Sequence, residues 1–358
     1  MTLSQNNFIR LAFEKAKVNL GSTKKNPSVG CVVEKNGSII SSGSTSINGR
    51  PHAEFNALNK NIDFKNSNLY VTLEPCSHYG KTPPCTNLIK IKKIKKIFFP
   101  TFDEDLRTKK KSLKLIQKKI KVKSNLEKTY ALDFYKSYFL QYKSDSLPLI
   151  DGKIALSKDY FTIDKKKKWI TSLASRKRVH LLRSMYDCIL STSKSINSDN
   201  SMLDCRLDGL EDKSPDLVIL DRSLKLKKKL KLISTAKKRK IIIVTSSRNK
   251  KKMSFFKKKG IFFLNFRSLN SYSDFVSLFQ KLKKNYSRIF VESGLTLMNF
   301  LVTKKFLSSM YVFKTNKPLK KNGVNFSSNK KLKKLKLKSK LKIHLSGDEL
   351  FKVKFKNV

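Results

Sequence analysis

The stretch TLEPCSHYGKTPPC, residues 72–85, decides how the first part of this chain folds. It places two cysteines, one histidine and three prolines in fourteen residues, although the whole chain of 358 residues has only five cysteines and four histidines. An apolar run typical of a buried strand, Leu69–Leu73, leads into it, and a helical pattern, Thr86–Ile94, follows. The stretch is therefore predicted to be a stiff loop between a strand and a helix.

The cysteines of this loop, together with a histidine upstream, are residue types that bind zinc. Eight residues separate Cys76 from Cys85, and the upstream segment PHAE contains His52 and Glu54. Two thiolates and one imidazole bind zinc, and three protein ligands leave a position for water, as in catalytic sites. Such a site needs a carboxylate to move protons, which is the role predicted for Glu54. A structural zinc would need a fourth protein ligand, for which His78 is the candidate.

The surrounding sequence supports this grouping. Pro51 suits the first turn of a predicted helix, PHAEFNALNK, and would place His52 and Glu54 in that half-open turn. Cys85 directly precedes the next predicted helix, whose positive N-terminal end should favour its thiolate. The other cysteines are predicted to be buried core residues: Cys31, Cys188 and Cys205.

Alternating strand and helix patterns predict two α/β domains. In the first, strand-like runs at Val29–Glu34 and Ile39–Ser44 flank Asn36-Gly37, a hairpin signal because both residues accept positive φ. The helical stretch Tyr130–Tyr142 is followed by a polar segment that ends in proline. This places the boundary near 143–147, with domains at residues 1–143 and 148–358.

The second domain is predicted to contain seven strands and a terminal hairpin that turns at Gly347-Asp348. Helices are predicted between several of these strands, notably at Ser175–Ser184 and Phe275–Lys283. The predicted strands are Leu149–Leu156, Asp187–Ser191, Asp216–Leu220, Lys240–Thr245, Gly260–Asn265, Arg288–Val291 and Met310–Phe313.

The formal net charge of +53 raises the question of a nucleic-acid partner. The 79 cationic residues are 67 lysines and 12 arginines, and the lysines are spread along most of the chain. Arginine is the residue that reads phosphates and bases with a fixed fork, so this composition favours solvated lysine faces over a binding groove. No apolar run reaches the roughly 18 residues of a membrane helix. The N-terminus lacks a secretion signal, so a cytoplasmic protein with reduced thiols is expected.

The motifs PHAE and EPCSHYGKTPPC, preceded by NPSVGCVV, resemble the deaminase domain of the bifunctional riboflavin-biosynthesis enzymes. These enzymes join diaminohydroxyphosphoribosylaminopyrimidine deaminase to 5-amino-6-(5-phosphoribosylamino)uracil reductase. The resemblance implies a cytidine-deaminase-like three-layer α/β/α domain in which His52, Cys76 and Cys85 bind Zn²⁺ and Glu54 shuttles protons. It also implies that Asn26 helps to hold the pyrimidine. The spacing of the cysteines differs from the P-C-x-x-C of nucleic-acid deaminases.

The second half resembles the reductase domain of the same family, which has a dihydrofolate-reductase-like α/β fold. The similar segments are KIALSKD, WITS, LLRS, SINSDNSMLDCR and VESGLT. NADPH is the implied cofactor, and a Rossmann glycine fingerprint is absent. The implied cofactor contacts are Ala155, Trp169, Ser195, Asp199, Gly294 and Thr296. The implied substrate contacts are Arg183, Leu203, Arg206 and Glu292.

The resemblance implies a cytoplasmic hydrolase and oxidoreductase of riboflavin biosynthesis. It would deaminate 2,5-diamino-6-(5-phosphoribosylamino)pyrimidin-4(3H)-one and then reduce the ribosyl side chain to ribityl. The implied partner is a phosphorylated pyrimidine. No association with a membrane is expected, and the chain could form a homo-oligomer. Because Ser193, Ser195 and Ser201 stand where the family has glycine, threonine and proline, one alternative is a deaminase with a degenerate, non-reducing second domain. The other alternative is a zinc-containing protein that binds or deaminates nucleic acid.

Overall fold

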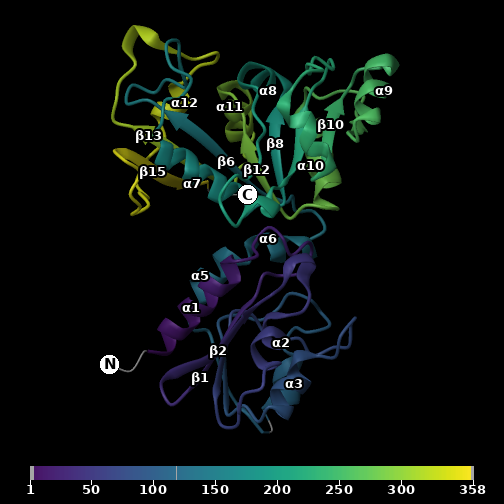
Figure 1. The fold of residues 1–358 in the computed structure, drawn as a ribbon, viewed down its shortest axis with the longest axis vertical. Helices are drawn as coiled ribbons and strands as arrows, with labels where there is room; N and C mark the ends of the chain where they lie inside the picture. Colours follow the sequence, from purple (N-terminus) through teal and green to yellow (C-terminus); the bar gives the residue numbers. More distant parts are fainter. Residues whose placement is uncertain (1–3, 118, 356–358) are drawn as a thin grey trace. The chain divides into compact units, whose positions relative to one another are not determined.

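The structure is a computed structural model that describes residues 4–117 and 119–355. The chain folds as two compact units that divide between Ser146 and Leu147 (Figure 1). Each unit has a central β-sheet and its own buried apolar side chains. Within the described ranges, every helix is too short or too polar to cross a lipid bilayer.

The first unit is built around a five-stranded sheet. Its strands are β1 (Gly30–Lys35), β2 (Ser38–Ser44), β3 (Asn68–Val71), β4 (Lys96–Phe99) and β5 (Lys121–Ser124). They lie in the order β2-β1-β3-β4-β5, and β1 is antiparallel to both its neighbours, whereas β3, β4 and β5 are parallel. The predicted hairpin is confirmed, since Asn36 and Gly37 join β1 to β2 with φ of 53° and 81°.

Helices cover both faces of this sheet, which gives the predicted three layers (Figure 1). A Cβ on Gly30 would lie 1.8 Å from the Ala12 carbonyl, and a Cβ on Gly43 would lie 2.4 Å from the Ala53 carbonyl. Gly43 is paired with Cys31, which points to the opposite face from Gly30, so the two adjoining helices cover opposite faces. The helices are α1 (Gln5–Lys17), η1 (Ile47–Gly49), α2 (Ala53–Leu58), α3 (Cys85–Ile91), α4 (Lys111–Ile116), α5 (Lys128–Phe134), α6 (Lys136–Phe139) and η2 (Leu140–Tyr142).

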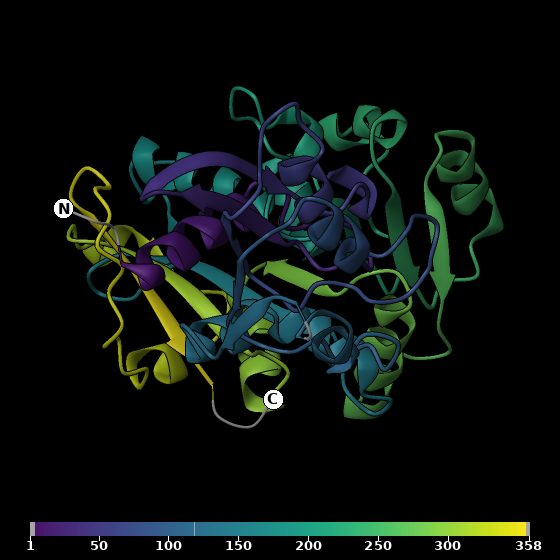
Figure 2. The same ribbon diagram turned by 90° about the horizontal axis from the view of Figure 1, so that it is seen from below.

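The second unit has an eight-stranded sheet in the order β11-β10-β9-β8-β12-β6-β13-β15. All neighbours are parallel except β13 and β15, which run side by side in opposite directions (Figure 2). The strands are β6 (Leu149–Leu156), β8 (Cys188–Thr192), β9 (Asp216–Leu220), β10 (Ile241–Thr245), β11 (Phe262–Asn265), β12 (Arg288–Glu292), β13 (Ser309–Thr315) and β15 (Asp348–Lys354). A separate short ladder pairs β7 (Ile163–Asp164) with β14 (Gly323–Val324).

Two apolar clusters fill the two faces of this larger sheet. Helices α10 and α11 supply side chains to one cluster, and α7, α8 and α9 supply side chains to the other. The helices are α7 (Leu173–Arg183), α8 (Ser193–Asp199), η3 (Glu211–Lys213), η4 (Lys231–Lys237), α9 (Lys250–Lys258), α10 (Tyr272–Lys283), α11 (Leu295–Thr303), η5 (Lys320–Asn322) and α12 (Lys330–Lys333). The parallel strands thus bring the loops at their carboxyl ends to one edge of the sheet, which is where such folds bind ligands.

Two sequence-based predictions about elements are wrong. The helix after Pro51 begins only at Ala53, because His52 is extended and occupies the N-cap position. The terminal strand does not form the predicted hairpin. It pairs along its length with β13 and is joined to the segment before it by a single bridge, Lys340 to Phe351. By contrast, the predicted helical stretch Tyr130–Tyr142 is confirmed, and it is divided into α5, α6 and η2.

Candidate active sites

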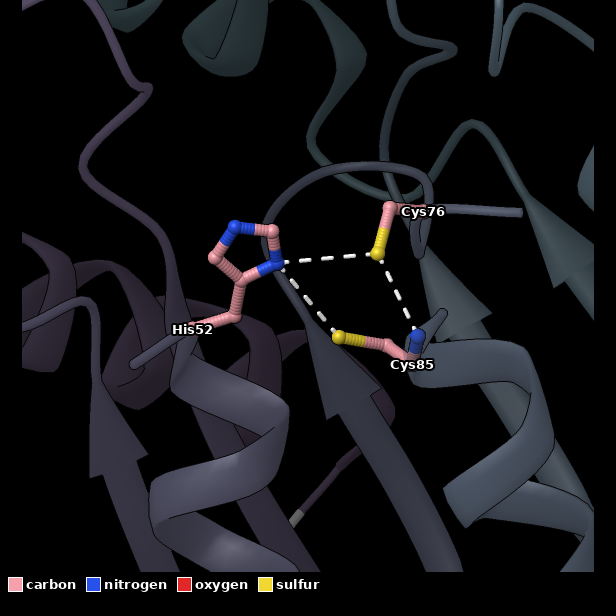
Figure 3. A group of neighbouring side chains, drawn as sticks. All are labelled: His52, Cys76 and Cys85. Carbon is pink, nitrogen blue, oxygen red and sulfur yellow. Dashed lines mark hydrogen bonds between the residues drawn. The ribbon is translucent and has the colours of Figure 1, made fainter. Parts of the chain in front are cut away.

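One imidazole and two thiols converge in the first unit (Figure 3). His52 precedes α2, Cys76 lies in the loop after β3, and Cys85 is the first residue of α3. The His52 Nδ1 atom lies 3.6 Å from the Cys76 Sγ and 3.5 Å from the Cys85 Sγ. Nitrogen and sulfur ligands of one tetrahedral zinc lie about 3.5 Å apart, so the three side chains fit this ion.

The two thiols are not equivalent. The backbone N–H of Cys85, at the start of α3, donates a hydrogen bond to the Cys76 Sγ at 3.2 Å. A hydrogen bond from the Cys85 side chain lowers the pKa of Cys76 to about 4. The same contact, together with burial, raises the pKa of Cys85 well above its ordinary value. The amide at the start of α3 is thus directed at Cys76, whereas the sequence-based prediction assigned the effect of this helix end to Cys85.

Glu54 is the carboxylate next to this group. It is the second residue of α2, with only 4% of its surface exposed. Burial raises its pKa to about 7, the negative charge of Cys76 acts in the same direction, and the positive charge of His52 opposes both. A carboxyl with a pKa near neutrality can both accept and release a proton at physiological pH.

Within the described parts of the chain, the group of mutually close ligand side chains consists of His52, Cys76 and Cys85. His78 lies outside it, because its Nδ1 atom is within 3.0 Å of the Thr108 hydroxyl. Asn26 donates through its Nδ2 to the carbonyl of Gly49 at 3.1 Å, in the segment that leads to His52. The structure therefore gives no support to the alternative of a structural zinc with His78 as fourth ligand.

Sequence reasoning missed a buried carboxylate that supports the zinc loop. Glu74, directly before Pro75, accepts hydrogen bonds from the backbone N–H of Asp103 and of Lys110, each at 3.1 Å. The Ser112 hydroxyl donates to its other oxygen at 2.5 Å. The glutamate thus orders the loop after β4, which contacts the zinc loop through the pair of His78 and Thr108. The signal available in the sequence was a charged residue, Glu74, directly after the apolar run Leu69–Leu73.

The second unit contains a buried ion pair. The Arg183 Nε donates to the Glu292 Oε1 at 2.6 Å, and Nη2 donates to Oε2 at 3.1 Å. Only 11% and 7% of these side chains are exposed. A third Arg183 bond, from Nη1, reaches the Asp204 carbonyl at 2.9 Å. The structure thus places two predicted substrate residues in contact, and joins them to the loop that carries Leu203 and Arg206.

Lys153 belongs to the same neighbourhood and was missed. It lies on β6, in register with Glu292 on the adjacent strand β12. Burial lowers the pKa of its ammonium group, Glu292 and Asp199 act to raise it, and Arg183 acts to lower it. A lysine inside an otherwise apolar strand, KIAL, was the signal that could have identified it.

The predicted cofactor residues gather only in part. Ser195 accepts from the backbone N–H of Gly294 at 3.1 Å, and its hydroxyl lies 3.0 Å from that of Thr192 and 3.4 Å from that of Ser293. These hydroxyls lie at the carboxyl ends of β8 and β12, at the starts of α8 and α11. The other predicted residues lie on separate segments: Ala155 on β6, Trp169 with 53% exposure beneath the Arg176 guanidinium, Asp199 at the end of α8, and Thr296 on α11.

Comparison with known proteins identifies the two units. Residues 3–101 match the family described as the cytidine and deoxycytidylate deaminase zinc-binding region, and residues 150–343 match the RibD C-terminal domain. The riboflavin biosynthesis protein RibD of Actinobacillus pleuropneumoniae is 33% identical over 301 residues, which are 83% of this chain and 79% of that protein. The chain belongs to the RibD family. The RibD of Bacillus amyloliquefaciens is 38% identical over 221 residues, 61% of this chain and 59% of its own.

Solved RibD structures share the fold. A Thermotoga maritima diaminohydroxyphosphoribosylaminopyrimidine deaminase/5-amino-6-(5-phosphoribosylamino)uracil reductase has a TM-score of 0.79 and 26% identity, with 98% of each chain covered. A RibD of Acinetobacter baumannii has a TM-score of 0.80 at 24% identity and equal coverage.

This member of the RibD family is accordingly a bifunctional deaminase and reductase of riboflavin biosynthesis that uses Zn²⁺ and NADPH. The predicted family, fold class and enzyme class are confirmed. The reductase match covers most of the second unit, so neither a degenerate domain nor a nucleic-acid protein is favoured.

Proposed function

We propose that the first unit, predicted as residues 1–143, carries the deaminase and that the second, predicted as residues 148–358, carries the reductase. The observation that supports this most directly is the convergence of one imidazole and two thiols in the first unit, beside a buried carboxylate. The Thermotoga relative is named for both reactions, which supports the same pair here. The substrate would be 2,5-diamino-6-(5-phosphoribosylamino)pyrimidin-4(3H)-one, deaminated first and then reduced from ribosyl to ribityl.

In the deaminase site, His52, Cys76 and Cys85 would hold Zn²⁺, and Asn26 would orient the pyrimidine. When bound, zinc would act as a Lewis acid that makes water nucleophilic near neutral pH. Glu54 accepts a proton at its carboxylate and returns it to the amino nitrogen that leaves as ammonia. Burial raises the pKa of this carboxyl, which favours its taking up a proton, and also keeps bulk water away from the transfers.

In the reductase site, Arg183, Leu203, Arg206 and Glu292 would bind the substrate. NADPH, when bound, supplies a hydride for the ribosyl carbon. The cofactor would lie against Ala155, Trp169, Ser195, Asp199, Gly294 and Thr296. Reduction also adds one proton, and we assign its delivery to the ammonium group of Lys153, because burial lowers its pKa and so eases proton release. Glu292, on the adjacent strand, keeps the charged form of this lysine populated.

A coupled assay tests the proposal. The purified protein should release ammonia from the phosphoribosylaminopyrimidine and then oxidise NADPH, which is followed by its absorbance. The variant Glu54→Gln should release no ammonia, retain its zinc by elemental analysis, and still oxidise NADPH when the deaminated compound is supplied. A variant that still deaminates at the wild-type rate would remove Glu54 from the mechanism, and a flat NADPH trace with wild-type protein would remove the reductase.

We further infer that the lysine excess does not serve a nucleic acid, and that the enzyme works in the cytoplasm. Several lysine ammonium groups lie over aromatic rings, as Lys281 does 4.3 Å from the ring centre of Phe266 and Lys314 does 4.5 Å from that of Tyr160. Such lysines cover apolar surface with their carbon chains. All five cysteines lie in described segments and are unbridged, which suits a reducing compartment. Tight, salt-dependent RNA binding at physiological ionic strength would contradict the first inference.

A further inference from the structure

Arg239 is a buried cation with no place in the reductase mechanism proposed above. It lies between η4 and β10, and 7% of its surface is exposed. The ion pairs between described residues do not include it. Burial lowers the pKa of its guanidinium to about 10. The charges of Asp204 and Asp216 oppose this shift, but neither carboxylate forms an ion pair with Arg239, so its hydrogen bonds have to be satisfied by other groups.

Those groups are backbone carbonyls, two of them in one loop. The Arg239 Nη1 donates to the Leu203 carbonyl at 2.6 Å and to the Pro215 carbonyl at 3.0 Å. Its Nη2 donates to the carbonyl of Met202. Its Nε donates to the Thr235 hydroxyl at 3.3 Å, which ties the guanidinium to η4. All three guanidinium nitrogens are therefore engaged, and two of them hold adjacent peptide groups of the loop 202–206.

The next peptide group of the loop is held by the substrate site itself. The Asp204 carbonyl accepts from the Arg183 Nη1 at 2.9 Å. Two residues later, the backbone N–H of Arg206 donates to the His180 Nδ1 at 3.1 Å. Three successive carbonyls are thus fixed by two guanidinium groups. Arg183 also binds Glu292, so this part of the loop and the ion pair share one hydrogen-bond network.

The loop needs such anchors because its conformation is unfavourable by itself. Leu203 has a φ of 53°, in the left-handed region that bulky side chains rarely adopt. Its side chain is buried. Strained residues of this kind persist only where the surroundings hold them, and they cluster at ligand sites. Without its two bonds to Arg239, the loop would relax and move both Leu203 and Arg206.

We propose that Arg239 is a positioning residue of the reductase: it fixes the loop 202–206 so that Leu203 and Arg206 meet the pyrimidine substrate. This inference rests on the proposed role of those two residues in substrate binding. Arg239 would thus contribute to the substrate specificity of the site without touching the substrate. Because the cofactor residues lie on other segments, the effect is directed at the pyrimidine and not at NADPH.

Steady-state kinetics of Arg239→Met, Arg239→Lys and the matched control Lys238→Met test the proposal. Lys238 is the exposed neighbour in sequence. Arg239→Met should raise the KM for the deaminated pyrimidine roughly tenfold, while the KM for NADPH stays within about twofold. Arg239→Lys, whose ammonium can reach one carbonyl, should lie between wild type and Arg239→Met. Lys238→Met should behave as wild type, and ammonia release should be unchanged in all three.

The other outcomes are equally decisive. An unchanged KM for the pyrimidine in Arg239→Met, or an equal rise in both KM values without recovery by lysine, would overturn the proposal. Arg239→Met could fail to fold, which would be seen as loss of a thermal transition while ammonia release persists. In that case Arg239→Lys decides. A selective rise in its KM for the pyrimidine supports the proposal, and a wild-type KM overturns it. Wild-type protein that oxidises no NADPH would instead refute the proposed reductase function.

Discussion

Removal of the Glu292 carboxylate should both destabilise the second unit and stop its reaction. The pair with Arg183 is bidentate, with N–O distances of 2.6 and 3.1 Å, and both side chains are almost fully enclosed. In Glu292→Ala the guanidinium would remain buried beside the ammonium of Lys153 with its main counter-charge gone. Breaking a buried pair in this way costs about 3–5 kcal/mol. For a unit of this size that corresponds to a melting temperature lower by roughly 6–20 °C.

The assay is thermal unfolding combined with separate measurement of the two activities. Ammonia release should persist, because the two sites lie in separate compact units. NADPH oxidation should disappear, because Glu292 is a proposed substrate-binding residue of the reductase. Glu292→Gln, which keeps one acceptor oxygen, should lose less stability, and the apolar double variant Arg183→Met with Glu292→Leu should recover most of it. A loss below about 1 kcal/mol for Glu292→Ala would refute the reasoning, since that is the contribution of a solvated surface pair.

Three further predictions concern metal, pH and packing. Removal of zinc by a chelator should abolish ammonia release and leave NADPH oxidation of supplied deaminated substrate intact; loss of both activities would contradict independent sites. Burial raises the pKa of Asp187 to about 6, so this acid stabilises the fold when protonated, and the free energy of unfolding should fall by about 3 kcal/mol between pH 4 and 6. Denaturant titrations should show that fall to be absent in Asp187→Asn, and an identical pH profile would rule the effect out. Gly30→Ala should destabilise the first unit by about 3 kcal/mol or more, because the added Cβ meets the Ala12 carbonyl of α1; a melting temperature equal to that of wild type would show that α1 can move away without cost.

Local signals in the sequence predicted much of the fold. Asn36-Gly37 specified the hairpin, and β6 and β9 were predicted with their observed bounds because apolar side chains dominate both. Strand β5 was missed, since KVKS is short, polar and only half-buried, and its place is decided by pairing with β4. The same holds for β15, whose partner β13 is distant in sequence, so a local turn signal suggested the wrong pairing.

The sites show the same division between local and tertiary information. His52, Cys76 and Cys85 were recognisable because rare residue types gather near prolines, and the structure brings them within reach of one ion. Their electrostatics were not predictable, because the Cys85 amide turns toward Cys76 only in the folded loop. Arg239 carries no local signal at all, since its partners are carbonyls that any residue provides.

The order of strands in the larger sheet constrains how this chain can fold as it leaves the ribosome. β6 is the first strand of its sheet to be synthesised, yet its neighbours β12 and β13 begin at Arg288 and Ser309, well over a hundred residues later. The first unit is complete by about residue 146, whereas β6 stays without its partners in the sheet until nearly all of the polypeptide has emerged. Because an unpaired apolar strand is prone to aggregate, we expect the incomplete second unit to be the stage of synthesis that most needs protection.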